Sequence, residues 1–327
     1  MINHFIACAW AAAVLVGTGA HAAQAAPRII SAVASSALGG PQQLSLDAFQ
    51  GEIRARMGER LVIDVRSGTT LGSENALLAA AQSGAVDVAI LTGPVVSTAV
   101  PEFGVFDMPF VFRDWTHVKA VSEGPLAEQI APKFAAKGLA LLAIGEQGFR
   151  NITNSKRPIR TPADLAGLKI RVLPNEIYQM TFRALGAEVV PMEFPLVYAA
   201  LKDARIDGQE NPISTIVGSS LQHVQKHLTL TRHFFAPIAV VMNREMFDSF
   251  EPADRKVLIE AARAAVERVR NSTSGNDAKG LERLKQDGME VVETVDRQPF
   301  IDAIRTLEPE FEKRFGKDLL AAIKAAR

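Results

Sequence analysis

Two arginines and a carboxamide-rich segment lie within about sixty residues of one another, each at the edge of an apolar stretch. The segments are Gly148-Phe149-Arg150, Lys169-Ile170-Arg171-Val172 and Asp207-Gly208-Gln209-Glu210-Asn211-Pro212. A guanidinium can donate two parallel N–H bonds to one carboxylate, and a carboxamide can both donate and accept. No G-x-S-x-G nucleophile motif or phosphate loop accompanies them. The set favours capture of an organic acid over its chemical conversion.

Arg171 is the first candidate for gripping a carboxylate. In the strand predicted over 168–173, alternation places Ile170 and Val172 on one face and Arg171 on the other. Arg171 also stands near the carboxyl end of that strand, where open α/β sheets bind ligands. From spacing alone, an exposed strand arginine or a structural ion pair is an equally open interpretation.

The second arginine, Arg150, follows the glycine-bracketed segment 145–149, which predicts a turn after an apolar strand. Gln147 in that turn is a further candidate contact, and a loop arginine paired with an acid is the alternative. Gln209 and Asn211 stand in a segment predicted as a loop at a strand end, suited to a ligand hydroxyl or carboxylate. An ordinary polar turn before proline would explain that segment too.

The histidines offer a possible metal site that the surrounding residues argue against. His223 and His227 are four apart, a spacing that puts both on one helical face, and His233 follows. The residues between the first two are Gln-Lys beside a valine, without the glutamate that a zinc hydrolase needs as a base. We interpret them as surface histidines and expect no metal and no cofactor.

The elements that must position these residues alternate between strand and helix. The first round comprises strands at 28–33, 61–65 and 86–91 and helices at 43–57 and 74–83. The second comprises strands at 139–144, 168–173 and 188–191 and helices starting at 161, 177 and 195. A βαβαβ order predicts mostly parallel sheets covered by helices. Residues 77–87 also resemble residues 197–207, which supports two similar lobes.

The C-terminal third is predicted to be mainly helical. A stripe of apolar residues defines a helix from 252 that continues to 284 despite two glycines. A short strand at 289–293 and helices at 299–315 and 318–326 follow. The long helix is suited to joining the two lobes.

The N-terminus predicts export. Residues 1–26 carry no charged side chain apart from two histidines, and small residues in A-x-A order allow cleavage after Ala22, Ala23 or Ala25. A membrane anchor is the alternative, although the apolar run is short for a span of ~20 residues. The one cysteine, Cys8, lies inside this segment, so the mature chain would form no disulfide. We expect a soluble periplasmic protein without direct membrane insertion.

The charge balance excludes one broad class of partner. The 36 basic and 36 acidic residues give a net charge of zero at pH 7. Such a balance provides no field that would draw the protein to nucleic acid or to an anionic membrane surface.

Taken together, these segments resemble the solute-binding subunit of TRAP (tripartite ATP-independent periplasmic) transporters, the DctP-type family. The likeness runs in order over about residues 28–320, through the loose N-terminal motifs Gly84-Ala85-Val86-Asp87 and Val105-Phe106-Asp107-Met108-Pro109-Phe110. The central motifs, Pro162 to Val172 and Asp207 to Pro212, are the more specific ones.

The resemblance implies a two-lobed α/β fold of the periplasmic-binding-protein kind, with a long inter-lobe helix. Residues 27–147 plus about 236–277 would form lobe I, and residues 148–235 plus about 278–327 would form lobe II. It implies that Arg171 holds the ligand carboxylate, that Arg150 and Asn211 are polar contacts, and that Phe194 is an aromatic wall. The partners would be a carboxylate-containing small molecule and the membrane permease subunits.

Departures from the family concern the far end of the ligand. The expected first-lobe contacts, 34–36 and 91–93 with Thr92, are small and uncharged, which argues against sialic acid. An exported enzyme using Glu210 or His233, or a binder that works without a permease, stays open as an alternative. We expect a binding protein without catalytic activity.

Overall fold

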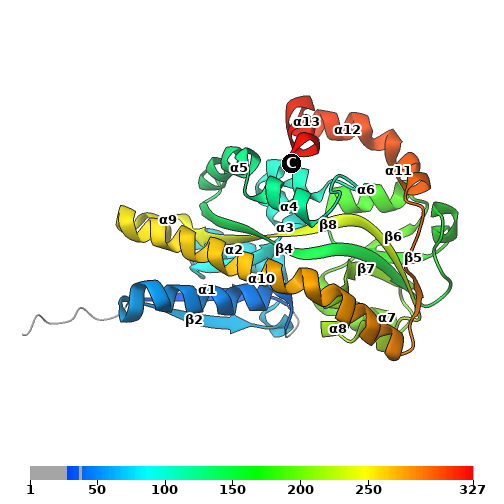
Figure 1. The fold of residues 1–327 in the computed structure, drawn as a ribbon, viewed down its shortest axis with the longest axis horizontal. Helices are drawn as coiled ribbons and strands as arrows, with labels where there is room; N and C mark the ends of the chain where they lie inside the picture. The colour runs from blue at the N-terminus through cyan, green and yellow to red at the C-terminus, as the bar shows by residue number, and fades with distance from the viewer. Residues whose placement is uncertain (1–27, 37–38, 327) are drawn as a thin grey trace, which may run out of the picture.

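The described residues form one mixed sheet with helices on both faces. A computed structural model describes residues 28–36 and 39–326, and within these ranges the sheet has nine strands (Figure 1). Their order is β2 (Leu61–Ser67), β1 (Arg28–Ala34), β3 (Val88–Thr92), β8 (His227–Asn243), β4 (Leu139–Asn154), β7 (Gly208–Pro212), β5 (Lys169–Val172) and β6 (Glu188–Pro191), with β9 (Glu290–Val292) beside β8.

The sheet contains two parallel groups joined by two long antiparallel strands. Strands β2, β1 and β3 run parallel in lobe I, and β7, β5 and β6 run parallel in lobe II. Between them β8 and β4 pair with each other in antiparallel fashion, and β8 runs antiparallel to β3 while β4 runs antiparallel to β7. In Figure 1 both strands cross the middle of the molecule, so both lobes share them. The two-lobed α/β fold predicted from the sequence is confirmed.

The helices cover both faces of this sheet. The first eight are α1 (Pro41–Met57), α2 (Glu74–Ser83), α3 (Gly93–Ala99), α4 (Trp115–Ser122), α5 (Pro125–Ala135), α6 (Glu176–Ala184), α7 (Val197–Lys202) and α8 (Ile213–Gly218). The remaining ones are α9 (Arg244–Asp248), α10 (Pro252–Gln286), α11 (Gln298–Ile304), α12 (Glu308–Phe315) and α13 (Lys317–Ala325).

Helix α10 is the predicted long helix, 35 residues without a break. Its first part buries Leu258, Ala261 and Ala265 in the core that contains α1 and the lobe I strands. Its last part buries Leu284 in a separate core formed by α7, α8 and their neighbours. One helix therefore packs against both lobes, as Figure 1 shows.

The likeness between residues 77–87 and 197–207 is structural. Each stretch is a helix followed by a turn and an aspartate, which leads into β3 or β7. The Asp87 carboxylate accepts the Ser31 N–H at 2.7 Å, and the Asp207 carboxylate accepts the Lys169 N–H at 2.9 Å. In both lobes the aspartate ties its turn to a neighbouring parallel strand, at the middle of β1 and at the start of β5.

Two predictions about local structure were wrong, and both concern the site. Residues 145–150 are not a turn, because β4 continues through them with a bulge at Gln147. Gly148 adopts φ 121° there, a conformation that glycine tolerates, so the strand bends without ending. The segment 208–212 is not a loop but strand β7, hydrogen-bonded to β4 on one side and β5 on the other.

Smaller differences lie near the ends of the chain. The helix predicted over 299–315 is interrupted by a 3₁₀ turn at Arg305–Leu307 and forms α11 and α12. The proposed signal peptide, residues 1–26, lies outside the described residues. Across the part of the chain that is described, we find no helix with the length and apolar character that a membrane span requires.

Candidate functional site

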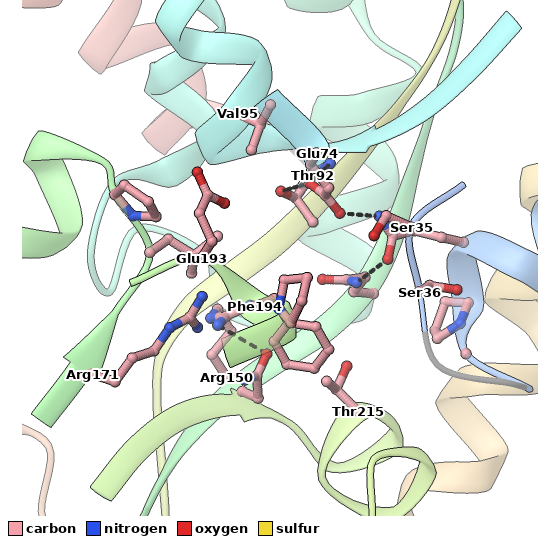
Figure 2. A pocket seen from close by; sticks show the side chains of 18 residues that line it. Ser35, Ser36, Glu74, Thr92, Val95, Arg150, Arg171, Glu193, Phe194 and Thr215 are labelled. Atoms are coloured by element: carbon pink, nitrogen blue, oxygen red, sulfur yellow. Dashed lines mark hydrogen bonds between the residues drawn. The ribbon is translucent and has the colours of Figure 1, made fainter. Parts of the chain in front are cut away.

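A cavity opens between the two lobes at the carboxyl ends of their parallel strands. Its volume is about 50 Å³, which on this measure accommodates roughly three to five waters and suits a compact organic acid. It is lined by Ser35, Ser36, Gly40, Pro41, Gln42, Glu74, Thr92, Val95, Gln147, Arg150, Arg171, Leu173, Pro174, Glu193, Phe194, Pro195, Asn211 and Thr215 (Figure 2).

Arg171 lies where the alternation of β5 predicted. Ile170 and Val172 enter the core, and the Arg171 side chain enters the cavity with 1% of the residue exposed. Its Nε donates to the Met192 carbonyl at 2.8 Å. Within residues 28–36 and 39–326 it forms no ion pair, so it is neither an exposed arginine nor half of a structural salt bridge.

The charge of Arg171 is maintained despite this burial. Burial lowers the pKa of Arg171 to about 10, and Arg150 adds to the lowering while three acids oppose it: Glu210, Glu193 and Glu74. The guanidinium is therefore charged at neutral pH. A buried cation without a bonded anion carries a large desolvation cost, which an anionic ligand would offset.

Arg150 is held by strand β7 next to it. Its Nε and Nη2 bond the Glu210 carboxylate at 2.5 and 2.8 Å, and Nη2 also bonds the Asn211 side-chain oxygen at 3.0 Å. Its Nη1 forms no bond with any residue in the described ranges and is left for the cavity. Burial would lower the pKa of Arg150, but Glu210 and its neighbours raise it.

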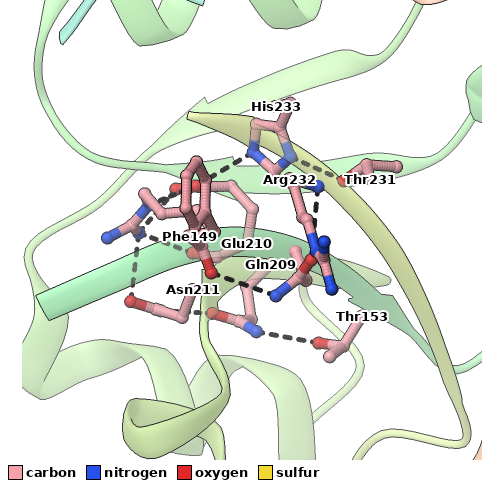
Figure 3. Close-up of polar contacts among 10 residues, drawn as sticks. Phe149, Thr153, Gln209, Glu210, Asn211, Thr231, Arg232 and His233 are labelled. Atoms are coloured by element: carbon pink, nitrogen blue, oxygen red, sulfur yellow. Dashed lines mark hydrogen bonds and ion pairs between the residues drawn. The ribbon is translucent and has the colours of Figure 1, made fainter. Parts of the chain in front are cut away.

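The acid of this pair is fixed from its other side by His233 (Figure 3). The Thr231 hydroxyl bonds His233 Nδ1 at 2.7 Å, and His233 Nε2 lies 3.2 Å from the Glu210 carboxylate. Burial lowers the pKa of His233, so the neutral ring donates from Nε2. Burial alone would raise the pKa of Glu210, yet Arg150 and His233 lower it, which keeps the carboxylate ionised.

Of the seven predicted contact residues, six line the cavity and one does not. Those that line it are Arg171, Arg150, Asn211, Phe194, Gln147 and Thr92. Gln209 lies behind Asn211, where its oxygen accepts from Asn211 and its nitrogen donates to Thr153 at 2.8 Å. The Phe194 ring lies beside Arg171, with the guanidinium carbon 5.8 Å from the ring centroid.

The expectation that lobe I offers only small, uncharged groups was wrong. Glu74, the first residue of α2, lines the cavity together with Thr92, and Glu193 lines it from lobe II. Sequence reasoning missed Glu74 because an acid at a helix start is an ordinary surface feature. Its carboxylate turns inward instead, because the Thr92 N–H donates to it at 3.0 Å and Gln42 donates at 2.5 Å.

A side-chain hydrogen bond crosses between the lobes beside the cavity. The Asn75 amide of α2 donates to Glu193 at 2.7 Å. Within lobe I, the Gln147 amide of β4 donates to Gln42 of α1 at 2.7 Å. The bond between Asn75 and Glu193 exists only while the lobes lie this close together.

The interpretation as surface histidines holds for His223, which is exposed, but is wrong for His227 and His233. His227 is 5% exposed and lies 3.2 Å from Glu290, and His233 is fully buried. His223 belongs to a 3₁₀ turn while His227 begins β8, so the two do not share a helical face.

Known proteins resemble this chain over nearly its whole length. The model of the DctP family, described as bacterial extracellular solute-binding protein, family 7, matches residues 32–314. A solute-binding protein of Verminephrobacter eiseniae is 36% identical over 90% of this chain and 88% of its own. The 2,3-diketo-L-gulonate-binding periplasmic protein YiaO of Escherichia coli is 32% identical over 86% and 87%.

Solved structures give the same likeness. A TRAP periplasmic solute-binding protein from Polaromonas sp. JS666, bound to D-erythronate, has a TM-score of 0.89 and 35% identity, covering 92% of this chain and 99% of its own. One from Bordetella bronchispeptica, with density interpreted as pantoate, has a TM-score of 0.89 and 34% identity over the same shares.

Proposed function

This chain belongs to the DctP family of bacterial extracellular solute-binding proteins, and we propose that it captures an organic acid through Arg171 and delivers it to a TRAP-type permease. Its family is one of solute-binding proteins and not of enzymes. In the proposed site Arg171 is the anchor, and Arg150, Asn211, Gln147, Thr92 and Phe194 complete the contacts.

One observation supports this proposal most directly: the cavity contains a buried, charged guanidinium to which no described acid is bonded. Glu210 is committed to Arg150, so it does not neutralise Arg171 by a direct bond. A ligand carboxylate would supply the missing anion and two acceptors that match the fork of the guanidinium.

The ligands of relatives agree with this chemistry. D-erythronate and galactonate, each bound by a structural neighbour, are carboxylates, and so is succinate in a third. We propose by analogy that a carboxylate is also the ligand here, and that the permease subunits of a TRAP transporter are the partners.

The sharing of β4 and β8 supports a closing motion. We propose lobe I as residues 27–147 plus about 236–277, and lobe II as 148–235 plus about 278–327. Both boundaries within the sheet fall near the bulge of β4 and its partner Ala236 on β8. Ligand bound to both lobes would favour the closed arrangement, because only that arrangement makes both sets of contacts.

The location follows from the same proposal. A periplasmic solute-binding protein must leave the cytoplasm, and the apolar, uncharged segment 1–26 would serve as its cleaved signal peptide. We also propose that the protein has no catalytic activity, since Glu210 and His233 are bonded to each other and to Arg150 or Thr231.

The test is a binding measurement on the purified protein. A thermal-shift screen of small organic acids, beginning with D-erythronate and pantoate, would find a ligand, and calorimetry would give its dissociation constant. Arg171→Ala should lose about 2–5 kcal/mol of binding, and Arg171→Lys should also bind poorly because the fork is lost. Lys169→Ala, exposed on the same strand, is the matched control. Normal binding by Arg171→Ala would refute the proposed anchor.

A further inference from the structure

The half of the cavity opposite the arginines is built from hydrogen-bond acceptors. Figure 2 shows Glu74 and Thr92 across the cavity from Arg150 and Arg171. One Glu74 oxygen accepts from the Thr92 N–H at 3.0 Å and from the Thr92 hydroxyl at 2.5 Å, and the other accepts from Gln42 at 2.5 Å. These hydrogen bonds lower the pKa of Glu74 and so oppose burial, the largest cause of its raised pKa, and the oxygen bonded by Gln42 can accept a further donor.

A second acceptor beside it lacks a donor. The Gln147 side chain is 6% exposed and lines the cavity, and its nitrogen donates to Gln42 at 2.7 Å. Its oxygen is buried and accepts no hydrogen bond from any residue in the described ranges. A buried acceptor without a donor is costly, so a ligand that brings an O–H there gains affinity.

The third acceptor is Glu193, whose carboxylate receives the Asn75 amide at one oxygen, at 2.7 Å. It is close enough to Glu74 to act on it, because its charge contributes to the raised pKa of Glu74, of which burial is the largest cause. The cavity therefore has one cationic side and one side where two acids and an unbonded amide oxygen lie.

We infer that this pocket selects compact monocarboxylates that carry hydroxyl groups away from the carboxylate, and that Glu74 makes it reject dicarboxylates. The inference rests on the proposed function, since it assumes that the ligand carboxylate binds Arg171. A ligand hydroxyl can donate a charge-assisted hydrogen bond to the Glu74 carboxylate. It can also donate to the Gln147 oxygen, which otherwise has no donor. A second carboxylate has no proton to donate and would be buried against Glu74.

The same groups disfavour the plain fatty acid of equal length. An alkyl chain would remove water from Glu74 and from the Gln147 oxygen and offer no donor in return. Sites built to hydrogen-bond a hydroxyl discriminate strongly against the analogue that lacks it, because the buried polar groups are then left unpaired.

Calorimetry with matched acids tests this without any mutation. The panel contains D-erythronate and longer aldonates, the dicarboxylates succinate, glutarate and adipate, and the alkanoates butyrate, valerate and hexanoate. At each chain length we expect the hydroxylated monocarboxylate to bind at least about 100-fold more tightly than either analogue, since like charges or unpaired polar groups cost several kcal/mol.

Glu74→Gln tests the residue itself. It keeps the shape and removes the charge, so we expect at least a tenfold gain in dicarboxylate affinity and a loss of aldonate affinity. Thermal unfolding without ligand checks that the variant is folded. Glu102→Gln, which changes an acid that does not line this cavity, is the matched control. It should change neither the dicarboxylate affinity nor the aldonate affinity.

The outcomes separate the two claims. A dicarboxylate or alkanoate that binds the unmodified protein as tightly as its hydroxylated counterpart overturns the inference and leaves acid capture intact. If no acid in the panel binds, capture of a small organic acid is itself wrong. If Glu74→Gln is folded and its ligand preference is unchanged, Glu74 is not the residue that makes the pocket reject dicarboxylates.

Discussion

Arg150 and Glu210 form a two-point ion pair in which both side chains are withdrawn from solvent, at 2% and 0% exposure. They stand on neighbouring strands of one sheet, β4 and β7. Either charge buried alone would carry a large desolvation cost, which the attraction between the two offsets. This pair explains why Arg150 can lie in a ligand cavity and still be fixed before any ligand arrives.

Removing the acid of this pair should destabilise the protein strongly. Glu210→Gln preserves the shape but leaves the Arg150 charge without its partner, and such a loss costs about 3–5 kcal/mol. Urea denaturation followed by circular dichroism measures the free energy of unfolding. Asp248→Asn, which breaks the exposed pair with Arg244, is the control and should have little effect. Equal stability of the two variants would contradict the importance of the buried pair.

Asp277 on α10 should make stability depend on pH. Burial raises the pKa of Asp277 to about 6, with Arg232 acting in the opposite direction. Because this value lies above the 3.8 of the unfolded chain, the folded protein favours the neutral carboxyl. The contribution of Asp277 to the free energy of unfolding is therefore full below pH 3.8 and is lost as the pH rises through 6.

Asp277→Asn should therefore raise the free energy of unfolding at pH 7.5 by up to about 3 kcal/mol and change it little at pH 3.5. Denaturation at both pH values measures the difference. Glu282→Gln, on an exposed part of the same helix, should show no such gain at the higher pH. A gain of equal size for Asp277→Asn at both pH values would contradict the titration of this carboxyl.

Asn75 and Glu193 should slow the release of ligand. Their hydrogen bond crosses between the lobes, so opening breaks it, and a bond of this kind contributes about 0.5–1.5 kcal/mol. Asn75→Ala should raise the dissociation rate roughly two- to tenfold, and Asn75→Asp should raise it further through repulsion. Stopped-flow fluorescence measures the rate. Gln82→Ala on the same helix is the control, and a dissociation rate unchanged in both Asn75 variants would argue against this role.

Arg171 was predictable because its signal is local. Alternation within β5 places it opposite Ile170 and Val172, and the strand end sets its position beside the cavity. The bulged strand through Gln147 was not predictable in this way, because glycines favour turns when they are seen without the neighbouring strands. Only the pairing with β8 and β7 makes residues 145–150 part of β4.

The positions of Glu74 and Gln209 were also not predictable from the local sequence. Glu74 was not expected in the cavity and lines it, whereas Gln209 was expected there and does not. Glu74 begins a helix, where an acid usually faces solvent, and its inward orientation depends on Thr92 and Gln42, which are distant in sequence. Gln209 belongs to a motif that is polar at every position from 209 to 211. Alternation places Gln209 and Asn211 on the same face of β7, so only the bonds of Gln209 to Asn211 and Thr153 show that it lies behind Asn211.

The route of the chain through the sheet sets the order in which the protein can fold. Strand β3 is complete at Thr92 and pairs with β1 along one edge, but the partner of its other edge is β8, so that Val88 waits for Met242. Until then the apolar edge Val88–Thr92 has no strand to cover it, and an uncovered apolar edge is prone to pair with other chains. Contacts this distant in sequence slow folding. Neither lobe can therefore be completed as an independent domain during synthesis, and a truncation before residue 243 should yield an aggregating fragment.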